Sequence, residues 1–235
     1  MSEKSVEFKV GKETLRGTMF VPSGKAPFPA VVFYHGSGSK RERYMPAAEA
    51  LAKEGVLTLA FDFRGCGESD GIFEEQTHSD AIEDAKAGLD FLLSQNVDKE
   101  RVGICGGSFG GYLAGYILPD YVIKSLVFRV PAAFSDRFLS SRIKRDNESK
   151  FFEDKNNWDT SSSYKNISKF KGPILILKAE NDEMVPAEVV DAYYNRATSS
   201  IKKELRVIKG ADHRFSGDLI NQFYDLTKGW FLQTL

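Results

Sequence analysis

The sequence predicts an α/β fold in which a mostly parallel eight-stranded sheet carries helices on both faces. Continuous apolar runs, typical of strands buried on both faces, alternate along the chain with segments whose apolar residues recur at helical spacing. A glycine-rich segment around one serine also joins such a run to the helix after it. A chain of this length could form one large α/β domain or two small ones, so length alone does not decide, and from the pattern as a whole we expect a single domain over residues 1–235.

The chain opens with an antiparallel pair and continues with two central strands. Residues 5–10 and 14–21 alternate or run apolar, and Gly11-Lys12 between them suits a tight turn. The apolar runs 30–34 and 56–63 both stop at turns that contain glycine. Residues 45–54 lie between these two runs. Their apolar spacing predicts a helix that the following glycine would close.

The rest of the chain continues the alternation. Thr77 and its neighbours give a capping signal for a helix that extends to about residue 95. The run 101–106 predicts a strand, residues 112–118 a helix that ends before a proline, and residues 124–130 another strand. Two strands and two helices complete the pattern: strands 173–178 and 204–208, helices 187–197 and 217–233.

Composition and charge exclude several functional classes. The formal net charge is -1, so no overall field favours nucleic acid or an anionic membrane surface. The N-terminus lacks the apolar segment of a secretory signal, and no apolar run reaches the length of a membrane span. Cys66 and Cys105 form no Cys-x-x-Cys pair, and no Cys/His cluster has zinc spacing. We therefore expect a soluble, cytoplasmic protein without a metal.

Ser108 is the candidate nucleophile. It is the central residue of Gly106-Gly107-Ser108-Phe109-Gly110, which fits Gly-x-Ser-x-Gly and stands between a predicted strand and a predicted helix. A sharp turn at this junction would expose the hydroxyl, and its neighbours must lack side chains so that strand and helix can approach. The start of the helix also favours negative charge beside the serine.

A serine hydroxyl is a weak nucleophile and needs a base. His213 follows the last strand and has the position of the base in the chain order Ser, acid, His. Asp182 follows the strand before it and is the expected acid, which would hold the reactive imidazole tautomer. Glu180 and Glu183 are nearby competitors. His78, at a helix start among acidic residues, is interpreted as a solvated neighbour of the cap.

The tetrahedral intermediate of acyl transfer would carry an oxyanion that needs hydrogen-bond donors already in place. Two backbone amides have suitable positions. One belongs to Phe109, directly after the nucleophile, and the other to Ser37, after His35-Gly36. His35 itself is interpreted as structural, orienting this loop through hydrogen bonds.

Further side chains are candidates for substrate contacts. Residues 134–171 are polar and charged, show no strand and helix rhythm and are too long for an ordinary loop, so we expect a cap or lid insertion. Its aromatic residues Phe138 and Trp158 are candidate contacts. Arg64 and Arg129 follow apolar runs near the ligand-binding edge of the sheet. Either could bind a substrate carboxylate or form a salt bridge that fixes a loop.

At these residues the sequence resembles the α/β-hydrolase fold family over nearly the whole chain, excepting the insertion. It is similar to small bacterial esterases of the cinnamoyl and feruloyl type. These share the turn His35-Gly36-Ser37, the stretch from Asp62 to Gly71, an acid loop ending in Val-Pro, and the Gly-Ala-Asp-His-x-Phe segment around His213. The resemblance implies that the insertion shapes the acyl pocket.

The nucleophile segment departs from that pattern. Those esterases usually carry Gly-His-Ser-x-Gly-Gly, whereas here Gly107 precedes Ser108 and Phe109 follows it. Gly-Gly-Ser-Phe-Gly-Gly-Tyr resembles the catalytic domain of the prolyl oligopeptidase family, although we expect no room in this chain for the propeller domain of those peptidases.

The sequence therefore predicts a serine hydrolase, specifically a carboxylesterase for small to medium acyl groups, aromatic ones included, that acts through an acyl-enzyme on Ser108. A serine peptidase or aminoacyl hydrolase, a thioesterase, and a non-catalytic receptor that keeps the fold are the alternatives. The expected partner is a small-molecule ester, with no nucleic acid, and a homodimer is left open. No metal or organic cofactor is implied.

Overall fold

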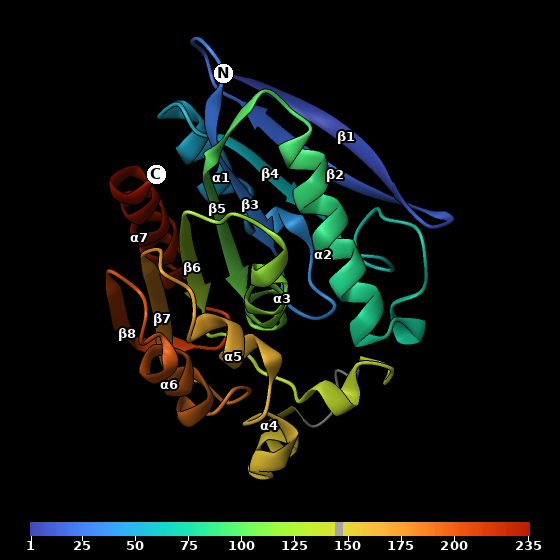
Figure 1. The fold of residues 1–235 in the computed structure, drawn as a ribbon, viewed down its shortest axis with the longest axis vertical. Coiled ribbons are helices and arrows are strands. Elements are labelled where there is room, and N and C mark those ends of the chain that lie inside the picture. Colours follow the sequence, from blue (N-terminus) through green and yellow to red (C-terminus); the bar gives the residue numbers. More distant parts are fainter. Residues whose placement is uncertain (144–147) are drawn as a thin grey trace.

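An eight-stranded sheet runs through the centre of the protein (Figure 1). The structure is a computed structural model that describes residues 1–143 and 148–235. The strand order is β1-β2-β4-β3-β5-β6-β7-β8. β2 is antiparallel to both of its neighbours, and all other neighbouring strands are parallel. The strands are β1 Ser2–Val10, β2 Glu13–Val21, β3 Phe28–Tyr34, β4 Leu57–Phe61, β5 Val97–Gly107, β6 Ser125–Arg129, β7 Ile174–Asn181 and β8 Lys203–Asp212.

Helices cover both faces of this sheet because successive side chains of a strand point to opposite faces. In β3, Ala30, Val32 and Tyr34 belong to the core on the side of α2, α3, α5 and α6. Val31 and Phe33 belong to the core on the side of α1 and α7. The α-helices are α1 Met45–Lys53, α2 His78–Leu93, α3 Phe109–Ile117, α4 Glu148–Glu153, α5 Ser162–Ile167, α6 Ala187–Arg196 and α7 Leu219–Thr234.

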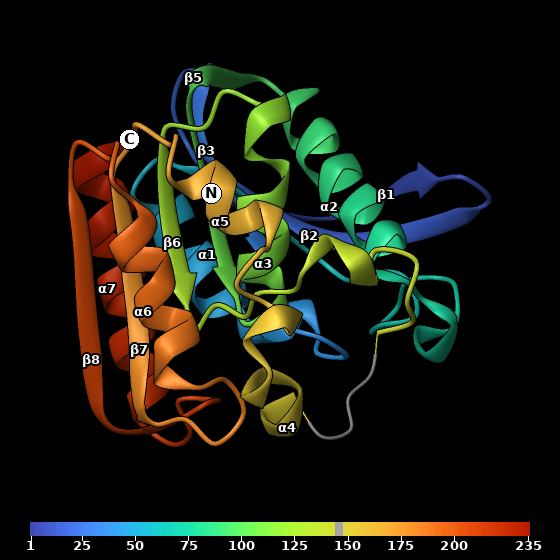
Figure 2. The same cartoon turned by 60° about the horizontal axis from the view of Figure 1, so that its bottom comes forward.

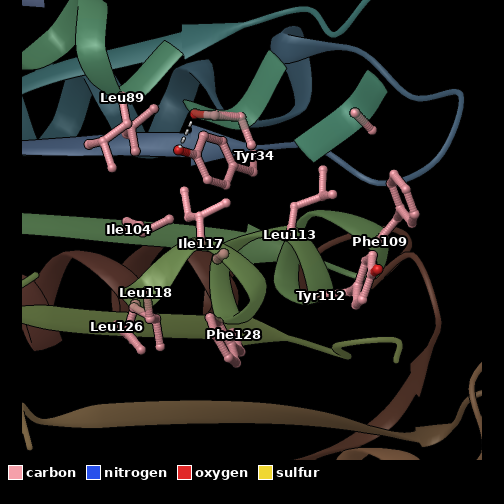
Figure 3. Packing of buried hydrophobic residues seen from close by; sticks show 14 of the residues in the cluster. Tyr34, Leu89, Ile104, Phe109, Tyr112, Leu113, Ile117, Leu118, Leu126 and Phe128 are labelled. Carbon is pink, nitrogen blue, oxygen red and sulfur yellow. Dashed lines mark hydrogen bonds between the residues drawn. The ribbon is translucent and has the colours of Figure 1, made fainter. Parts of the chain in front are cut away.

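Packing between α2, α3 and the sheet fixes the helix that follows Ser108. Leu113 and Ile117 of α3 belong to the same buried cluster as Ile104 of β5 and Tyr34 of β3 (Figure 3). The phenol of Tyr34 is fully buried and donates to the carbonyl oxygen of Ala85 at 2.7 Å, so its polar atom is satisfied. Burial of each large apolar side chain contributes roughly 1.5–3 kcal/mol, which makes this junction a rigid part of the fold.

The predicted fold class is confirmed, and several element boundaries differ from the prediction by a few residues. β5 and β8 are longer than predicted, and α3 begins at Phe109 rather than at residue 112. Gly110 and Gly111 lower the helix propensity of this segment. The first turn of α3 is nevertheless buried, so tertiary packing outweighs the local preference. Both cysteines are buried and free.

The predicted capping signal before α2 is confirmed. Thr77 Oγ1 accepts the backbone N–H of Asp80 at 3.2 Å, and Asp80 Oδ2 accepts the backbone N–H of Thr77 at 2.8 Å. This reciprocal pair satisfies two donors that the first helical turn leaves open. It also fixes His78 as the first residue of α2.

The expected insertion, residues 134–171, lies between β6 and β7, and residues 144–147 of it are outside the described residues. Its described part contains α4, α5 and the 3-10 helices η4 Asp136–Phe138 and η5 Lys155–Asn157. Figures 1 and 2 both show α4 at the end of the molecule toward which β5 and β6 point. Over residues 1–143 and 148–235, no helix is long and apolar enough to cross a membrane.

Candidate active site

Ser108 stands at a sharp turn between β5 and α3. Its backbone has φ 52° and ψ −117°, which is strained for a residue with a side chain. Hydrogen bonds hold this conformation, since Ser108 N donates to the carbonyl of Arg129 at 2.9 Å and Ala132 N donates to the carbonyl of Ser108 at 3.1 Å. A Cβ added at Gly106 would lie 2.5 Å from the carbonyl oxygen of Gly110. A side chain there would push strand and helix apart, as the sequence argument anticipated.

His213, after the end of β8, and Asp182, after the end of β7, form a hydrogen-bonded pair. Nδ1 of His213 lies 2.9 Å from each carboxylate oxygen of Asp182, and the two side chains are only 7% and 5% exposed. An ionised carboxylate only accepts, so Nδ1 carries the proton and Nε2 keeps its lone pair. The backbone N–H groups of Met184 and Val185 donate to Asp182 Oδ1 at 3.0 and 2.9 Å and fix the carboxylate.

The two competing acids lie apart from the imidazole. Glu180 is exposed and accepts the backbone N–H of Gly210 at 2.8 Å. Glu183 is also exposed. Among the described residues, Asp182 is the one carboxylate that is hydrogen-bonded to His213.

Ser108 and His213 border one pocket of about 340 Å³ at the carboxyl ends of the parallel strands. Within the described part of the chain, no hydrogen bond joins the Ser108 hydroxyl to the imidazole. Such bonds are often long before substrate binds and shorten in the complex. The structure thus brings the three predicted residues together. Asp182 is already hydrogen-bonded to His213, whereas the bond between Ser108 and His213 would form when substrate binds.

The loop after β3 contributes Ser37 to the lining of this pocket. Nε2 of His35 accepts the N–H of Phe63 at 3.0 Å, so Nδ1 carries the proton and donates to the carbonyl of Gly36 at 2.8 Å. Burial lowers the pKa of His35, which keeps the ring neutral. The amides of Ser37 and Phe109 donate to no other described residue. The latter starts α3, where an N–H has no partner within the helix.

The two arginines weighed from the sequence make different contacts. Arg64 Nε donates to Oδ1 of the buried Asp84 at 2.7 Å, and Arg64 N donates to its Oδ2 at 2.9 Å, so this arginine fixes a loop through a salt bridge. Arg129 is 3% exposed, borders the pocket, and donates from Nη1 to the carbonyl of His213 at 2.6 Å. It forms no ion pair with another described residue, so the salt-bridge interpretation does not extend to it.

The interpretation of His78 as a solvated residue is wrong. The side chain is 5% exposed, and ring centroids of Phe134, Phe109 and Tyr112 lie 4.7, 5.3 and 5.9 Å from its own. Burial lowers the pKa of His78 to about 4, so the ring is neutral at neutral pH. The pattern around it identified the cap at Thr77 but carried no sign that the insertion packs over the first turn of α2.

The aromatic candidates of the insertion lie within its own packing. Trp158 is 2% exposed and donates from Nε1 to the carbonyl of Phe152 at 2.9 Å. Phe138 packs against Phe151 with ring centroids 5.0 Å apart. Neither borders the larger pocket or a second pocket of about 20 Å³ beside Ser108. That second pocket is formed by other apolar and aromatic side chains together with Ser37, namely His78, Phe109, Ala132, Phe134, Ile143 and Phe152.

Sequence reasoning missed two charged residues of the larger pocket, Arg43 and Arg214. Arg43 ends the 3-10 helix η1 (Arg41–Arg43), far from any recognised motif. Arg214 directly follows His213, and this adjacency was the one signal that could have identified it. No group of His, Cys, Asp and Glu that could hold a metal ion is found within residues 1–143 and 148–235.

A model of the prolyl oligopeptidase family matches residues 43–235. Among curated proteins, thiohydrolase aneE of Aspergillus aculeatus is 37% identical over 103 residues, which cover 43% of this chain and 32% of that protein. The chain spans 63% or less of the length of the first four curated relatives that it matches.

Solved structures share the fold over nearly their whole length. Est1E from Butyrivibrio proteoclasticus, solved with ferulic acid bound, has a TM-score of 0.78 and 22% identity, with 97% of this chain and 98% of that chain covered. The esterase Pf2001 of Pyrococcus furiosus has a TM-score of 0.74 and 25% identity, with 99% and 93% covered. The predicted α/β-hydrolase fold is confirmed, and because the family model covers well over half of the sequence, this chain belongs to the prolyl oligopeptidase family.

Proposed function

We propose that this protein is a carboxylesterase that cleaves esters of small to medium acyl groups through an acyl-enzyme on Ser108. The observation that carries the proposal is the hydrogen-bonded pair of Asp182 and His213, which borders the same pocket as a serine held in a strained turn. A weak nucleophile, a base with a free lone pair and an acid that orients the base are the parts that acyl transfer needs.

Acylation begins when the Ser108 hydroxyl attacks the ester carbonyl. His213 Nε2 takes the hydroxyl proton, and the charge on the resulting imidazolium is stabilised by Asp182. The carbonyl oxygen becomes an oxyanion, for which the amides of Ser37 and Phe109 are the proposed donors. When the intermediate collapses, the bond to the leaving alcohol breaks and His213 returns the proton to that alcohol.

Deacylation repeats the same chemistry with water. Nε2 of His213 takes a proton from water, the hydroxide attacks the acyl carbon, and the Ser108 oxygen leaves and regains the proton. One ester and one water thus give one acid and one alcohol, and the residues return to their starting state. The proton transfers involve only the chain, the ester and water, so no further acid or base is required.

Two neighbouring activities use the same residues and differ in the leaving group. Membership of the prolyl oligopeptidase family and the Gly107-Ser108-Phe109 segment favour an amine leaving group, as in a peptidase or aminoacyl hydrolase. The similarity to a protein named thiohydrolase favours a thiol. The ester assignment rests on the likeness to esterase folds over nearly the whole chain.

The test compares leaving groups on purified protein. 4-Nitrophenyl esters of increasing acyl length, methyl ferulate, an acetyl thioester and aminoacyl anilides are assayed with wild type, with Ser108→Ala and with Ser94→Ala, an exposed serine at the end of α2. We expect ester turnover that Ser94→Ala retains and Ser108→Ala loses, together with fluorophosphonate labelling of Ser108. Anilide turnover without ester turnover would establish the peptidase alternative instead. Loss of activity in both variants would show that the assay does not report on Ser108.

A further inference from the structure

The larger pocket beside Ser108 is positively charged. Arg43, Arg129 and Arg214 border it, and none of the acidic residues that the structure describes does. The three arginines come from separate parts of the fold, namely η1, the end of β6 and the loop after β8. The overall charge of the chain is -1, so this local excess is not a consequence of composition.

These arginines lack the carboxylate partners that several other arginines of the protein have. Within the described residues, none of the three forms an ion pair, whereas Arg41 pairs with Asp62 and Arg64 pairs with Asp84. The guanidinium hydrogen bonds of Arg129 and Arg43 go to neutral backbone oxygens. Arg129 Nη1 donates to His213 and Arg43 Nη1 donates to Arg214, each at 2.6 Å.

Bringing like charges together costs free energy unless an anion compensates them. Arg43 experiences this cost directly, because burial and the positive charges of Arg129 and Arg214 lower the pKa of its guanidinium. A guanidinium has five N–H donors in a planar fork, so a single backbone contact leaves donors available for a carboxylate or phosphate. The pocket beside Ser108 therefore has positive charge that no carboxylate neutralises and guanidinium N–H donors that are available to an anion.

The position of His213 decides which part of the substrate enters this pocket. In the proposed mechanism, the imidazole returns its proton to the leaving group, so the leaving group departs on the side of His213. His213 borders the arginine pocket and does not border the small aromatic pocket, whereas Ser37 and Ser108 border both. The acyl group then faces the aromatic pocket, and the leaving group faces the arginines.

We propose, on the basis of the proposed function, that the natural substrate has a leaving group with an anionic substituent, a carboxylate or a phosphate, which Arg43 and Arg214 bind. The guanidinium of Arg129, which is 3% exposed and lies deeper in the pocket, attracts the same anion through its positive charge. The bond changes are those of ester hydrolysis. The Ser108 oxygen bonds to the acyl carbon, the bond to the leaving oxygen breaks, and the released alcohol carries the anion away from the site.

Three acetyl esters with similar leaving groups test this inference. They are 4-acetoxybenzoate, 4-acetoxyphenyl phosphate and the neutral 4-acetoxybenzamide, and each kcat/KM is divided by the ester's own rate of alkaline hydrolysis. We expect at least one anionic ester to exceed the neutral ester by about tenfold at low salt, since hydrogen bonds to charged groups are among the stronger ones. The preference falls as ionic strength rises, because part of the pocket is open to solvent. The better of the two anions identifies the substituent.

Substitutions assign the preference to the named residues. Arg214→Gln and Arg43→Gln each lower the ratio of anionic to neutral kcat/KM, and the double variant brings it close to 1, because Arg129 contributes only its electrostatic field and no direct contact. Arg206→Gln is the matched control, because Arg206 is exposed on β8 and pairs with Glu204 away from the pocket. Thermal unfolding of each variant verifies that it is folded.

Three results would overturn the inference, and they differ in what they mean for the proposed function. Ser108-dependent hydrolysis of all three esters with no preference for charge would remove the inference and leave the proposed function intact. A preference that persists in the double variant would show that these arginines do not bind the anion. Absence of Ser108-dependent turnover for every ester, without fluorophosphonate labelling, would remove the proposed function and the inference with it.

Discussion

Arg129 donates from Nη1 to the backbone carbonyl of His213 at 2.6 Å, and this contact connects the ends of β6 and β8. The backbone carbonyl of the same arginine accepts the N–H of Ser108 at 2.9 Å. Its guanidinium also lies 5.5 and 5.8 Å from the ring centroids of Phe215 and Phe223. The buried Arg129 therefore fixes the backbone of the proposed nucleophile, Ser108, and that of the proposed base, His213.

Replacing this residue tests its positioning role. We expect Arg129→Met to lower the free energy of unfolding by about 2 kcal/mol, the typical value of a hydrogen bond to a charged group. We also expect kcat for neutral 4-nitrophenyl acetate to fall more than KM rises, because the His213 segment loses its anchor while the pocket stays open. Urea unfolding and steady-state kinetics measure the two effects. Arg206→Met is the control, and an unchanged kcat in a destabilised Arg129→Met would contradict the positioning role.

The contact between Asp182 and His213 gives a second prediction. Asp182→Asn keeps the size of the side chain but presents an amide N–H to Nδ1, which favours the tautomer with the proton on Nε2. That proton occupies the lone pair that Ser108 needs, so we expect kcat to fall by about 10⁴-fold with little change in thermal stability. The steady-state rate and the melting temperature are measured on the same preparation.

Glu183→Gln is the matched control for this prediction. It removes one carboxylate from the same loop, at an exposed position one residue away. We expect it to retain activity within about twofold, as surface substitutions generally have small effects. A loss in Glu183→Gln equal to that in Asp182→Asn would mean that the charge of the loop matters and the geometry does not.

The parts of the fold that the sequence predicted are those set by local chemistry. Strands such as β3 and β6 are continuous apolar runs, and α2 begins at a capping box, so periodicity and hydrogen-bonding residues identify them directly. The order Ser108, Asp182, His213 was readable because parallel strands bring their carboxyl ends to one edge.

The parts that could not be predicted depend on contacts between distant segments. His78 and Thr77 are neighbours, yet burial of His78 is decided by Phe134, more than fifty residues later in the chain. Arg43 borders the pocket because η1 folds against the loop that contains Arg214. Neither contact leaves a periodic pattern in the sequence, so only the assembled sheet reveals them.

The close approach of α3 to β3 gives a third prediction. A Cβ at Gly110 would collide with the backbone carbonyls of Tyr34 and His35, so Gly110→Ala must displace either α3 or the loop after β3. We expect the free energy of unfolding to fall by about 2 kcal/mol, in the range of overpacked sites, and kcat to fall with it. Chemical denaturation and ester hydrolysis measure these effects.

Gly229 of α7 is the matched control, because a Cβ added there meets no atom within 4 Å. Alanine is a better helix former than glycine, so Gly229→Ala should raise the free energy of unfolding by about 0.5–1 kcal/mol. Activity should stay the same. Stability changes of opposite sign in the two variants would locate the cost at the turn, whereas destabilisation by both would point to a general intolerance of these helices to alanine.

Burial of His78 gives the last prediction, which concerns stability at acid pH. The pKa of this imidazole is lowered from its ordinary 6.5 to about 4 by burial. As the pH falls from 7 to 5, His78 therefore takes up a proton in the unfolded chain but stays neutral in the folded protein. The contribution of His78 to stability is complete above about pH 6.5 and is lost as the pH falls toward 4. It amounts to about 2 kcal/mol between pH 7 and 5.

His78→Leu removes this titration without opening a large cavity. Within the described residues Nδ1 of His78 has no hydrogen-bond partner, so the substitution leaves no new unsatisfied group behind. Urea unfolding at pH 7 and pH 5 should show a smaller loss of stability in His78→Leu than in wild type. His35, whose pKa burial also lowers, contributes to the acid loss of both proteins and cancels in the comparison. Parallel losses in the two proteins would show that His78 titrates alike in the folded and unfolded states, and hence that the insertion does not shield it from water.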